Sequence, residues 1–105
     1  MSERELGGKK VNIDEEGFLT NPDEWDENVA KAIAQEEGID ELSDRHWDVI
    51  HFMRKDYKEK GEPPSIRRIK NVGGIPTKEL YQLFPKGPAK IAARISGLEK
   101  PKGCV

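Results

Sequence analysis

Proline and glycine interrupt this chain of 105 residues at short intervals, and these interruptions constrain its fold more than any other feature. They fall at Gly38, Gly61, Pro63–Pro64, Pro85 and Gly97. Proline removes a backbone hydrogen bond inside a helix, and glycine commonly ends one. Since no apolar run is long enough to span a bilayer, we expect a small, compact bundle of short helices.

Helix start signals precede each segment between the breaks. Serine, threonine and asparagine are good N-cap residues, and proline suits the first helical position. Such residues stand at Asn21–Pro22, Ser43, Ser65, Thr77 and Pro88. Five helices are therefore expected, over residues 22–37, 44–60, 66–72, 78–84 and 88–96.

Apolar residues at helical spacing indicate which helix faces form the core. In the second helix, Trp47 and Ile50 share a stripe that we assign to packing. In the third, Ile66, Ile69 and Val72 are expected to point inward.

The two ends of the chain are expected to differ from the helical middle. Val11 and Ile13 alternate with polar residues, and a turn over "DEEG" separates them from Phe18 and Leu19, which indicates a short β-hairpin. Residues 98–105 offer little to bury and are expected to form a flexible arm reaching on the order of 20 Å. The predicted class is mainly α, with one domain over residues 1–97 and the arm over 98–105.

The net charge of −2 conceals a strong asymmetry between the two halves. Residues 1–50 carry 15 acidic and 5 basic side chains, whereas residues 51–105 carry 5 acidic and 13 basic ones. This asymmetry favours either docking of one charged face on a polar molecule or neutralisation of one half by the other within the fold.

Compartment and cofactor expectations follow from a few residues. The N-terminus lacks the apolar stretch of a signal peptide, and one cysteine cannot form an internal disulfide, so we expect a cytoplasmic protein. His46 and His51 are five residues apart on the second helix and point away from each other. No third ligand accompanies them, so we expect neither a metal nor another cofactor.

The single cysteine, Cys104, is the next-to-last residue. It has no neighbours to pack against within its own segment, which favours a reactive role over a structural one. Lys100 and Lys102 favour the thiolate, the C-terminal carboxylate opposes it, and Gly103 leaves the backbone beside the sulfur uncluttered. A thiolate on a reachable arm can accept sulfur from one protein and present it to another. An incidental cysteine at a frayed end is the alternative.

Several motifs together resemble the DsrC/TusE family of sulfur-transfer proteins, which includes the gamma subunit associated with dissimilatory sulfite reductase. The segments are "DEEGFL", "HWDVIHFMR", "PPSIRRI", "LFPKGPAK" and "GLEKPKGCV". The resemblance covers residues 9–105. It implies a compact helical fold with an N-terminal hairpin, a flexible arm, and a penultimate cysteine, Cys104, that accepts sulfur as a persulfide. It also implies partners that donate and receive sulfur: a sulfurtransferase, the tRNA thiolation machinery or a sulfite reductase.

Departures from the family pattern bear on the pathway. Members that work with sulfite reductase typically carry a second cysteine where this chain has Ala93. Single-cysteine members resemble the relay component that passes sulfur toward 2-thiouridine in tRNA. Glu99 replaces a common proline, and the segment over residues 70–79 is shorter than in many relatives. The sequence leaves open tRNA thiolation versus sulfite metabolism, and whether Ala93 is natural or replaces a cysteine.

Further site residues follow from the resemblance. Arg67 and Lys90 match family positions that line the surface where the arm rests, and Lys100 and Lys102 steer the arm or stabilise a persulfide anion. Such a carrier is recharged by a donor protein and is not a self-sufficient catalyst.

A second interpretation is a helix-turn-helix that binds nucleic acid. Residues 66–105 carry nine basic and two acidic side chains, and two short helices there are joined by a glycine-containing turn. The second of these helices offers only Lys78, Glu79 and Gln82 to base edges. Weak contact with nucleic acid within a larger complex therefore fits better than specific DNA binding.

Overall fold

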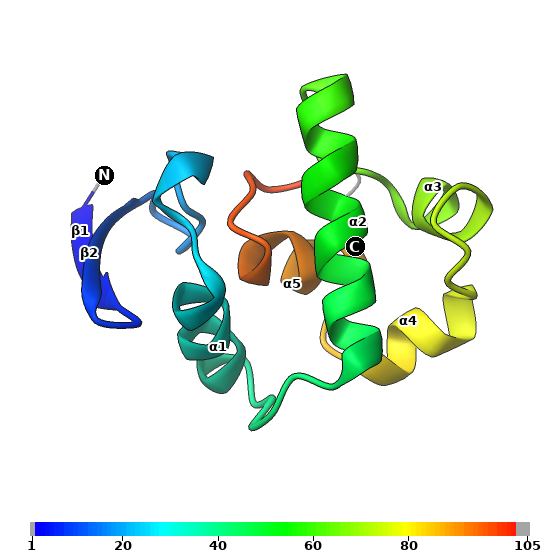
Figure 1. Cartoon of the computed structure of the whole chain (residues 1–105), viewed down its shortest axis with the longest axis horizontal. Coiled ribbons are helices and arrows are strands. Elements are labelled where there is room, and N and C mark those ends of the chain that lie inside the picture. Colours follow the sequence, from blue (N-terminus) through cyan, green and yellow to red (C-terminus); the bar gives the residue numbers. More distant parts are fainter. Residues whose placement is uncertain (1, 103–105) are drawn as a thin grey trace.

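A computed structural model describes residues 2–102 of the chain, and residues 1 and 103–105 lie outside the described part. It contains β1 (Ser2–Leu6), β2 (Lys9–Ile13), a 3-10 helix (Pro22–Glu24), α1 (Glu27–Glu36), α2 (Asp44–Lys60), α3 (Ile66–Asn71), α4 (Thr77–Leu83) and α5 (Pro88–Ile95). The strands form a two-stranded antiparallel sheet at one end of a helical body (Figure 1). The predicted mainly α class with a small N-terminal sheet is confirmed.

Helix α5 forms the centre of the fold. It contacts α1 on one side and α2 and α4 on the other, and Figure 1 shows it between α1 and α2. All of its residues except Lys90 are buried, and the burial continues through Leu98. Six of its eight residues are apolar, which suits a short helix that the other helices enclose.

The core draws large side chains from every part of the chain. Eight that are less than 2% exposed are Phe18, Ile33, Ile50, Met53, Leu80, Phe84, Ile95 and Leu98. Full burial of each such side chain contributes about 1.5–3 kcal/mol to folding. Trp47 packs against this core as a partly buried residue, and Ile50 lies within it, so the assignment of both to packing is confirmed.

The hairpin differs from the expected one. Val11 and Ile13 pair with Ser2–Leu6 through a turn at Gly7 and Gly8, whose φ angles are 61° and 83°. Two consecutive positive φ angles suit a two-residue hairpin turn, which glycine adopts without strain. The expected pairing with residues 18–19 survives only as a single bridge from Ile13 to Leu19.

The first helix begins later than expected. The Asn21 side chain accepts a hydrogen bond from the Asp23 amide, but it caps only the 3-10 helix. The chain is then extended at Trp25, and Asp26 caps α1 by accepting a bond of 2.8 Å from the Val29 amide. Because of this break, Trp25 lies outside both helices and has an extended backbone.

The second helix has the expected bounds. Ser43 caps its start, and the His46 ring accepts a hydrogen bond back from the Ser43 amide. Gly61 ends it with a φ angle of 78°, in the left-handed region that favours glycine.

Two expectations about α3 and α4 are wrong. Val72 is 59% exposed, because α3 ends at Asn71 and a turn at Gly73 and Gly74 brings Ile75 into the core instead. Thr77 is the first residue of α4 and not its cap, because Pro76 occupies the N-cap position and offers no side-chain acceptor.

Ion pairs join the acidic and basic halves. Glu36 and Glu37 pair with Arg94 at 2.7 Å each, Glu16 pairs with Lys100 at 2.9 Å, and Arg45 pairs with Glu79 at 2.8 Å. The charge asymmetry of the sequence is thus partly neutralised within the fold. None of the described helices is both long and apolar enough to cross a membrane.

Candidate functional site

The described part of the chain leads up to the cysteine without reaching it. Gly103 and Cys104 lie outside the described residues, as does the end of the predicted arm. The site can therefore be built from the segment that precedes them, residues 96–102, and from the groove that this segment borders. The division into a domain over 1–97 and an arm over 98–105 stays a prediction.

Trp25 holds the start of this segment. Its indole Nε1 donates a hydrogen bond of 2.8 Å to the carbonyl oxygen of Ile95, the last residue of α5. Gly97 follows with a φ angle of 74°, and a Cβ atom there would lie 2.5 Å from Cδ1 of Trp25. Only glycine allows both this left-handed turn and so close an approach of the ring.

Arg54 of α2 completes the same attachment. Its Nη1 donates a bond of 2.8 Å to the carbonyl oxygen of Ser96, and its Nη2 donates one of 3.2 Å to that of Pro22. Its guanidinium carbon lies 4.0 Å from the centre of the Trp25 ring, a cation–π contact. Burial lowers the pKa of Arg54, but the group stays charged, because an arginine is not deprotonated in a protein.

The next residues also contact the body. Leu98 is only 1% exposed, and Pro101 is buried. The Tyr57 hydroxyl donates a hydrogen bond of 2.9 Å to the Glu99 carboxylate, and burial raises the pKa of Tyr57. Lys100 reaches Glu16 in the turn after β2 at 2.9 Å. The segment therefore follows a defined path as far as residue 101.

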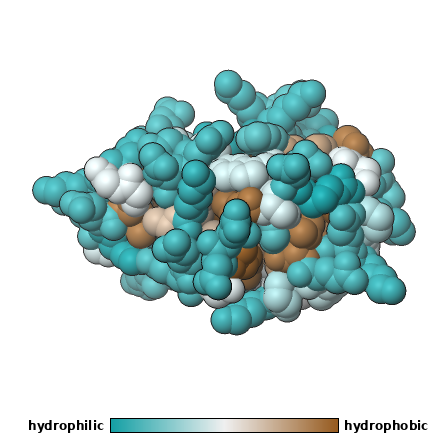
Figure 2. Space-filling model, turned by 60° about the horizontal axis from the view of Figure 1, so that its bottom comes forward, coloured by the Kyte–Doolittle hydropathy of each residue, from teal (hydrophilic) through white to brown (hydrophobic). Residues whose placement is uncertain are grey.

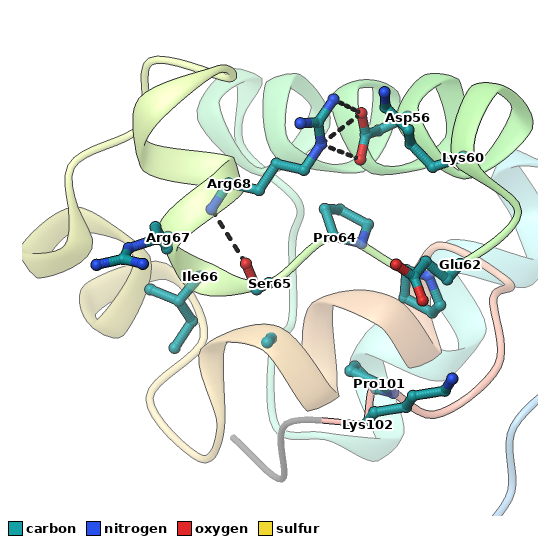
Figure 3. Close-up of a pocket in the computed structure, with 12 residues that line it drawn as sticks. Asp56, Lys60, Glu62, Pro64, Ser65, Ile66, Arg67, Arg68, Pro101 and Lys102 are labelled. Atoms are coloured by element: carbon teal, nitrogen blue, oxygen red, sulfur yellow. Dashed lines mark hydrogen bonds and ion pairs between the residues drawn. The ribbon is translucent and has the colours of Figure 1, made fainter.

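A groove of about 680 Å³ lies beside this path, between the end of α2, the start of α3 and the C-terminal segment. We call it the C-terminal groove. Figure 3 shows Arg68 reaching across to Asp56, with bonds of 2.7–2.9 Å. Asp56 is 3% exposed, and its hydrogen bonds raise the pKa of Arg68.

The charge of the C-terminal groove is net positive. Its basic residues are Lys60, Arg67, Arg68 and Lys102, and its acidic residues are Asp56 and Glu62. A positive groove beside the segment that leads to Cys104 favours an anionic group there.

The predicted site residues are only partly brought together. Arg67 and Lys102 both line the C-terminal groove, although Figure 3 shows the Arg67 side chain extending away from Lys102. Lys90 is half-buried on α5 and does not line it. Lys100 lies along the path with its ammonium group at Glu16.

Sequence reasoning missed Trp25 and Arg54 as site residues. The Trp25 ring donates a hydrogen bond to a carbonyl group 70 residues further along the chain. No local sequence pattern predicts this contact. Arg54 did carry a signal, because it falls on the same helical stripe as Ile50 and Tyr57. A cation on an apolar stripe needs a buried partner, which here is a set of carbonyl groups and a ring.

Ala93 is fully buried, with 0% of its surface exposed, on the central helix. Its carbonyl oxygen accepts a hydrogen bond of 3.0 Å from the amide of Leu98, which closes the turn that starts the C-terminal segment. Ala93 is thus part of the core.

The two histidines make contacts within the fold. Besides its cap, His46 makes a contact of 2.9 Å between Nε2 and the carbonyl oxygen of Leu83. The His51 ring lies against the Trp47 ring, with 5.8 Å between centroids. Across residues 2–102, no group of three or more histidine, cysteine, aspartate or glutamate residues is placed to hold a metal ion.

Two charged groups of the expected helix-turn-helix are bound within the protein. Glu79 of α4 accepts two hydrogen bonds from Arg45, which lower the pKa of Glu79, and Arg68 of α3 is bound to Asp56. These contacts compete with any contact to nucleic acid.

Comparisons with known proteins agree with this architecture. The family model described as "DsrC like protein" matches residues 5–105. The dissimilatory-type sulfite reductase subunit gamma of Nitratidesulfovibrio vulgaris is 39% identical over 105 residues, covering 100% of both chains. The sulfurtransferase TusE of Salmonella typhimurium is 44% identical over 105 residues, covering 93% of this chain and 95% of its own.

Solved structures show the same likeness. The crystal structure of dissimilatory sulfite reductase I (DsrI) matches with a TM-score of 0.89 and 38% identity, over 99% of this chain and 100% of that one. The oxidized DsrC gamma subunit of Archaeoglobus fulgidus matches with a TM-score of 0.79 and 41% identity, also over 99% and 100%.

Proposed function

The chain belongs to the DsrC family, and from that membership we propose that it carries sulfur as a persulfide on Cys104 and hands it to an acceptor protein. One observation carries the proposal. The match to a family with sulfurtransferase members extends to residue 105, and the matched segment contains the only cysteine of the chain. Sulfur transfer through a thiol must therefore use Cys104.

The transfer needs no change in overall oxidation state. The Cys104 thiolate attacks the outer sulfur of a donor persulfide, forming a new S–S bond while the donor S–S bond breaks. The donor thiolate leaves with the electron pair of that bond and takes up a proton. In the second step an acceptor thiolate attacks the outer sulfur on Cys104, and the Cys104 thiolate leaves in turn.

Ala93 supports a relay that uses one thiol. With alanine in the core at this position, the chain cannot form an internal disulfide or hold a sulfur atom between two of its own cysteines. The likeness to TusE therefore guides the choice of pathway, and we propose a relay of the tRNA 2-thiolation type. The donor and acceptor are other proteins of the cytoplasm, and the reaction requires no cofactor of this chain.

The described surroundings suggest how the protein assists. The attachment by Trp25 and Arg54 fixes the start of the C-terminal segment, and buried Pro101 continues this fixed path to within three residues of Cys104. Lys102 and the other cations of the C-terminal groove favour the anionic form of a bound persulfide. Lys100 contributes by tying the segment to Glu16, and for Lys90 we retain the expected role in docking.

Intact-mass spectrometry tests the proposal. The protein is incubated with a cysteine desulfurase and cysteine, or with a rhodanese and thiosulfate, and compared with Cys104→Ser. We expect the gain of one sulfur atom, mapped to Cys104 and reversed by a thiol reductant, and no gain in the serine variant. Maleimide labelling of the same sample shows that the thiol is accessible. If the accessible thiol stays unmodified with several active donors, the carrier function is refuted.

A further inference from the structure

A second hollow lies on the opposite end of α2 from the C-terminal groove. It has a volume of about 360 Å³ and lies where the chain passes from α1 to α2. We call it the α1–α2 hollow. Its apolar wall consists of Ile39, Leu42 and Trp47, all partly buried against the core. Figure 2 views this side of the molecule and shows apolar side chains in hollows between polar ones.

Carboxylates border this wall without internal partners. Asp40 and Glu41 line the hollow, and Asp44 follows at the start of α2. Within residues 2–102, no hydrogen bond or ion pair joins any of these three side-chain carboxylates to another residue. Lys31 also lines the hollow, so three carboxylates against one ammonium group leave this edge with a net negative charge that a basic partner can meet.

Trp47 gives the hollow the character of a protein-binding surface. Its ring lies against His51 and is only partly buried, and the indole N–H makes no hydrogen bond to another residue in the described range. Tryptophan beside an apolar pocket is enriched among residues that dominate binding energies. The volume of about 360 Å³ is at the lower end of the range of binding pockets and has room for one or two side chains.

We propose that the α1–α2 hollow docks a lysine- or arginine-rich segment of another protein, which inserts one apolar side chain between Leu42 and Trp47. Charge complementarity identifies this occupant, because the rim is acidic and the wall is apolar. The lining of the hollow includes none of residues 96–102, so the test of the proposal does not depend on sulfur transfer by the cysteine. A second copy of the chain is a poorer occupant, because a contact between unlike faces does not close into a dimer.

Nuclear magnetic resonance with the peptide acetyl-Lys-Lys-Leu-Lys-Lys-amide tests the proposal on the whole chain. The indole N–H signals of Trp47 and Trp25 are distinguished with the variant Trp47→Phe. We expect a saturable shift of the Trp47 signal, whereas the Trp25 signal, whose N–H is bound to Ile95, stays in place as an internal reference.

Two matched double variants test the charge. Asp40→Asn with Glu41→Gln should weaken binding of the peptide roughly three- to tenfold, as the loss of two exposed charge contacts predicts. Glu59→Gln with Glu62→Gln removes the same number of charges at the far end of α2 and should leave the affinity unchanged.

Other outcomes would overturn the proposal. A Trp47 signal that does not move with millimolar peptide excludes docking in the hollow. Equal weakening by both double variants shows attraction by net charge alone. Equal binding of a peptide with asparagine in place of leucine shows that the apolar wall has no role. Self-association by sedimentation that is lost in the Asp40 and Glu41 variant assigns the hollow to a second copy of the chain.

Discussion

Replacing Gly97 with alanine should lower the free energy of unfolding by about 3 kcal/mol. Two contributions add up to this value. The first is the backbone, because the φ angle of 74° is unfavourable for any residue with a Cβ atom. The second is the Trp25 ring, since the new Cβ atom would lie 2.5–2.7 Å from three of the Trp25 carbon atoms. Real Cβ atoms do not approach that closely, so the ring must move.

The magnitude follows from what the ring loses when it moves. The left-handed backbone costs about 1–2 kcal/mol for an alanine. Displacing Trp25 breaks its hydrogen bond to Ile95, worth about 1 kcal/mol. It also removes the cation–π contact with Arg54, worth about 0.5–1 kcal/mol. The part that depends on Trp25 is therefore about 2 kcal/mol.

Gly61→Ala is the matched control. Gly61 has nearly the same φ angle, 78°, but no atom lies within 4 Å of a Cβ atom built there. Thermal unfolding followed by circular dichroism should show a small decrease in Tm for Gly61→Ala and about twice that or more for Gly97→Ala. In a domain of this size, 1 kcal/mol corresponds to roughly 4–8 °C.

A double-mutant cycle separates the two parts. On the background of Trp25→Ala, the ring is gone, and Gly97→Ala should then cost no more than Gly61→Ala does in the original protein. Equal Tm values for the two single glycine variants would refute the reasoning, because the close approach of Trp25 would then carry no energetic cost.

Two further predictions concern Arg94 and its partners. Arg94→Met should destabilise the protein by roughly 1.5–3 kcal/mol in urea unfolding, since it leaves Glu37 without its cation while Glu36 keeps Arg4; a loss under about 0.5 kcal/mol would contradict this. The hydrogen bond from Arg4, and then that from Arg94, lower the pKa of Glu36 from its usual 4.5, so Glu36 stabilises the fold above that pH. This stability is lost as the pH falls through the lower folded pKa, and Glu36→Gln should flatten the decrease of Tm below pH 4.5.

The local features of the fold could be predicted from the sequence because their causes are local. The second helix has its expected bounds, since Ser43 and Gly61 act on residues within one turn of themselves. The hairpin was assigned to the wrong partner because residues 2–5 are polar and exposed, so no apolar alternation marks them as a strand. Val72 was expected in the core because of its helical spacing. That spacing does not show that the chain turns at glycine after α3 and buries Ile75 in place of Val72.

The candidate site also has a part that the sequence predicts and a part that it does not. The hypothesis that Cys104 is the site could be formed from its motif alone, since the residues that carry the resemblance are contiguous in sequence. The attachment by Trp25 and Arg54 could not be predicted, because its contacts join residues 32 to 70 positions apart. Such pairings depend on where α5 and α2 lie in the fold, and only the packed structure determines this.

The central position of α5 also bears on how the protein is made. Residues 88–98 are synthesised after α1 and α2, yet they supply the surface on which these helices pack. During translation, the apolar faces of the earlier helices therefore have no partner until these residues have emerged from the ribosome. The earlier helices therefore complete their packing only after residue 98 has emerged, and a nascent chain stalled before Pro88 would expose apolar surface to chaperones or to aggregation.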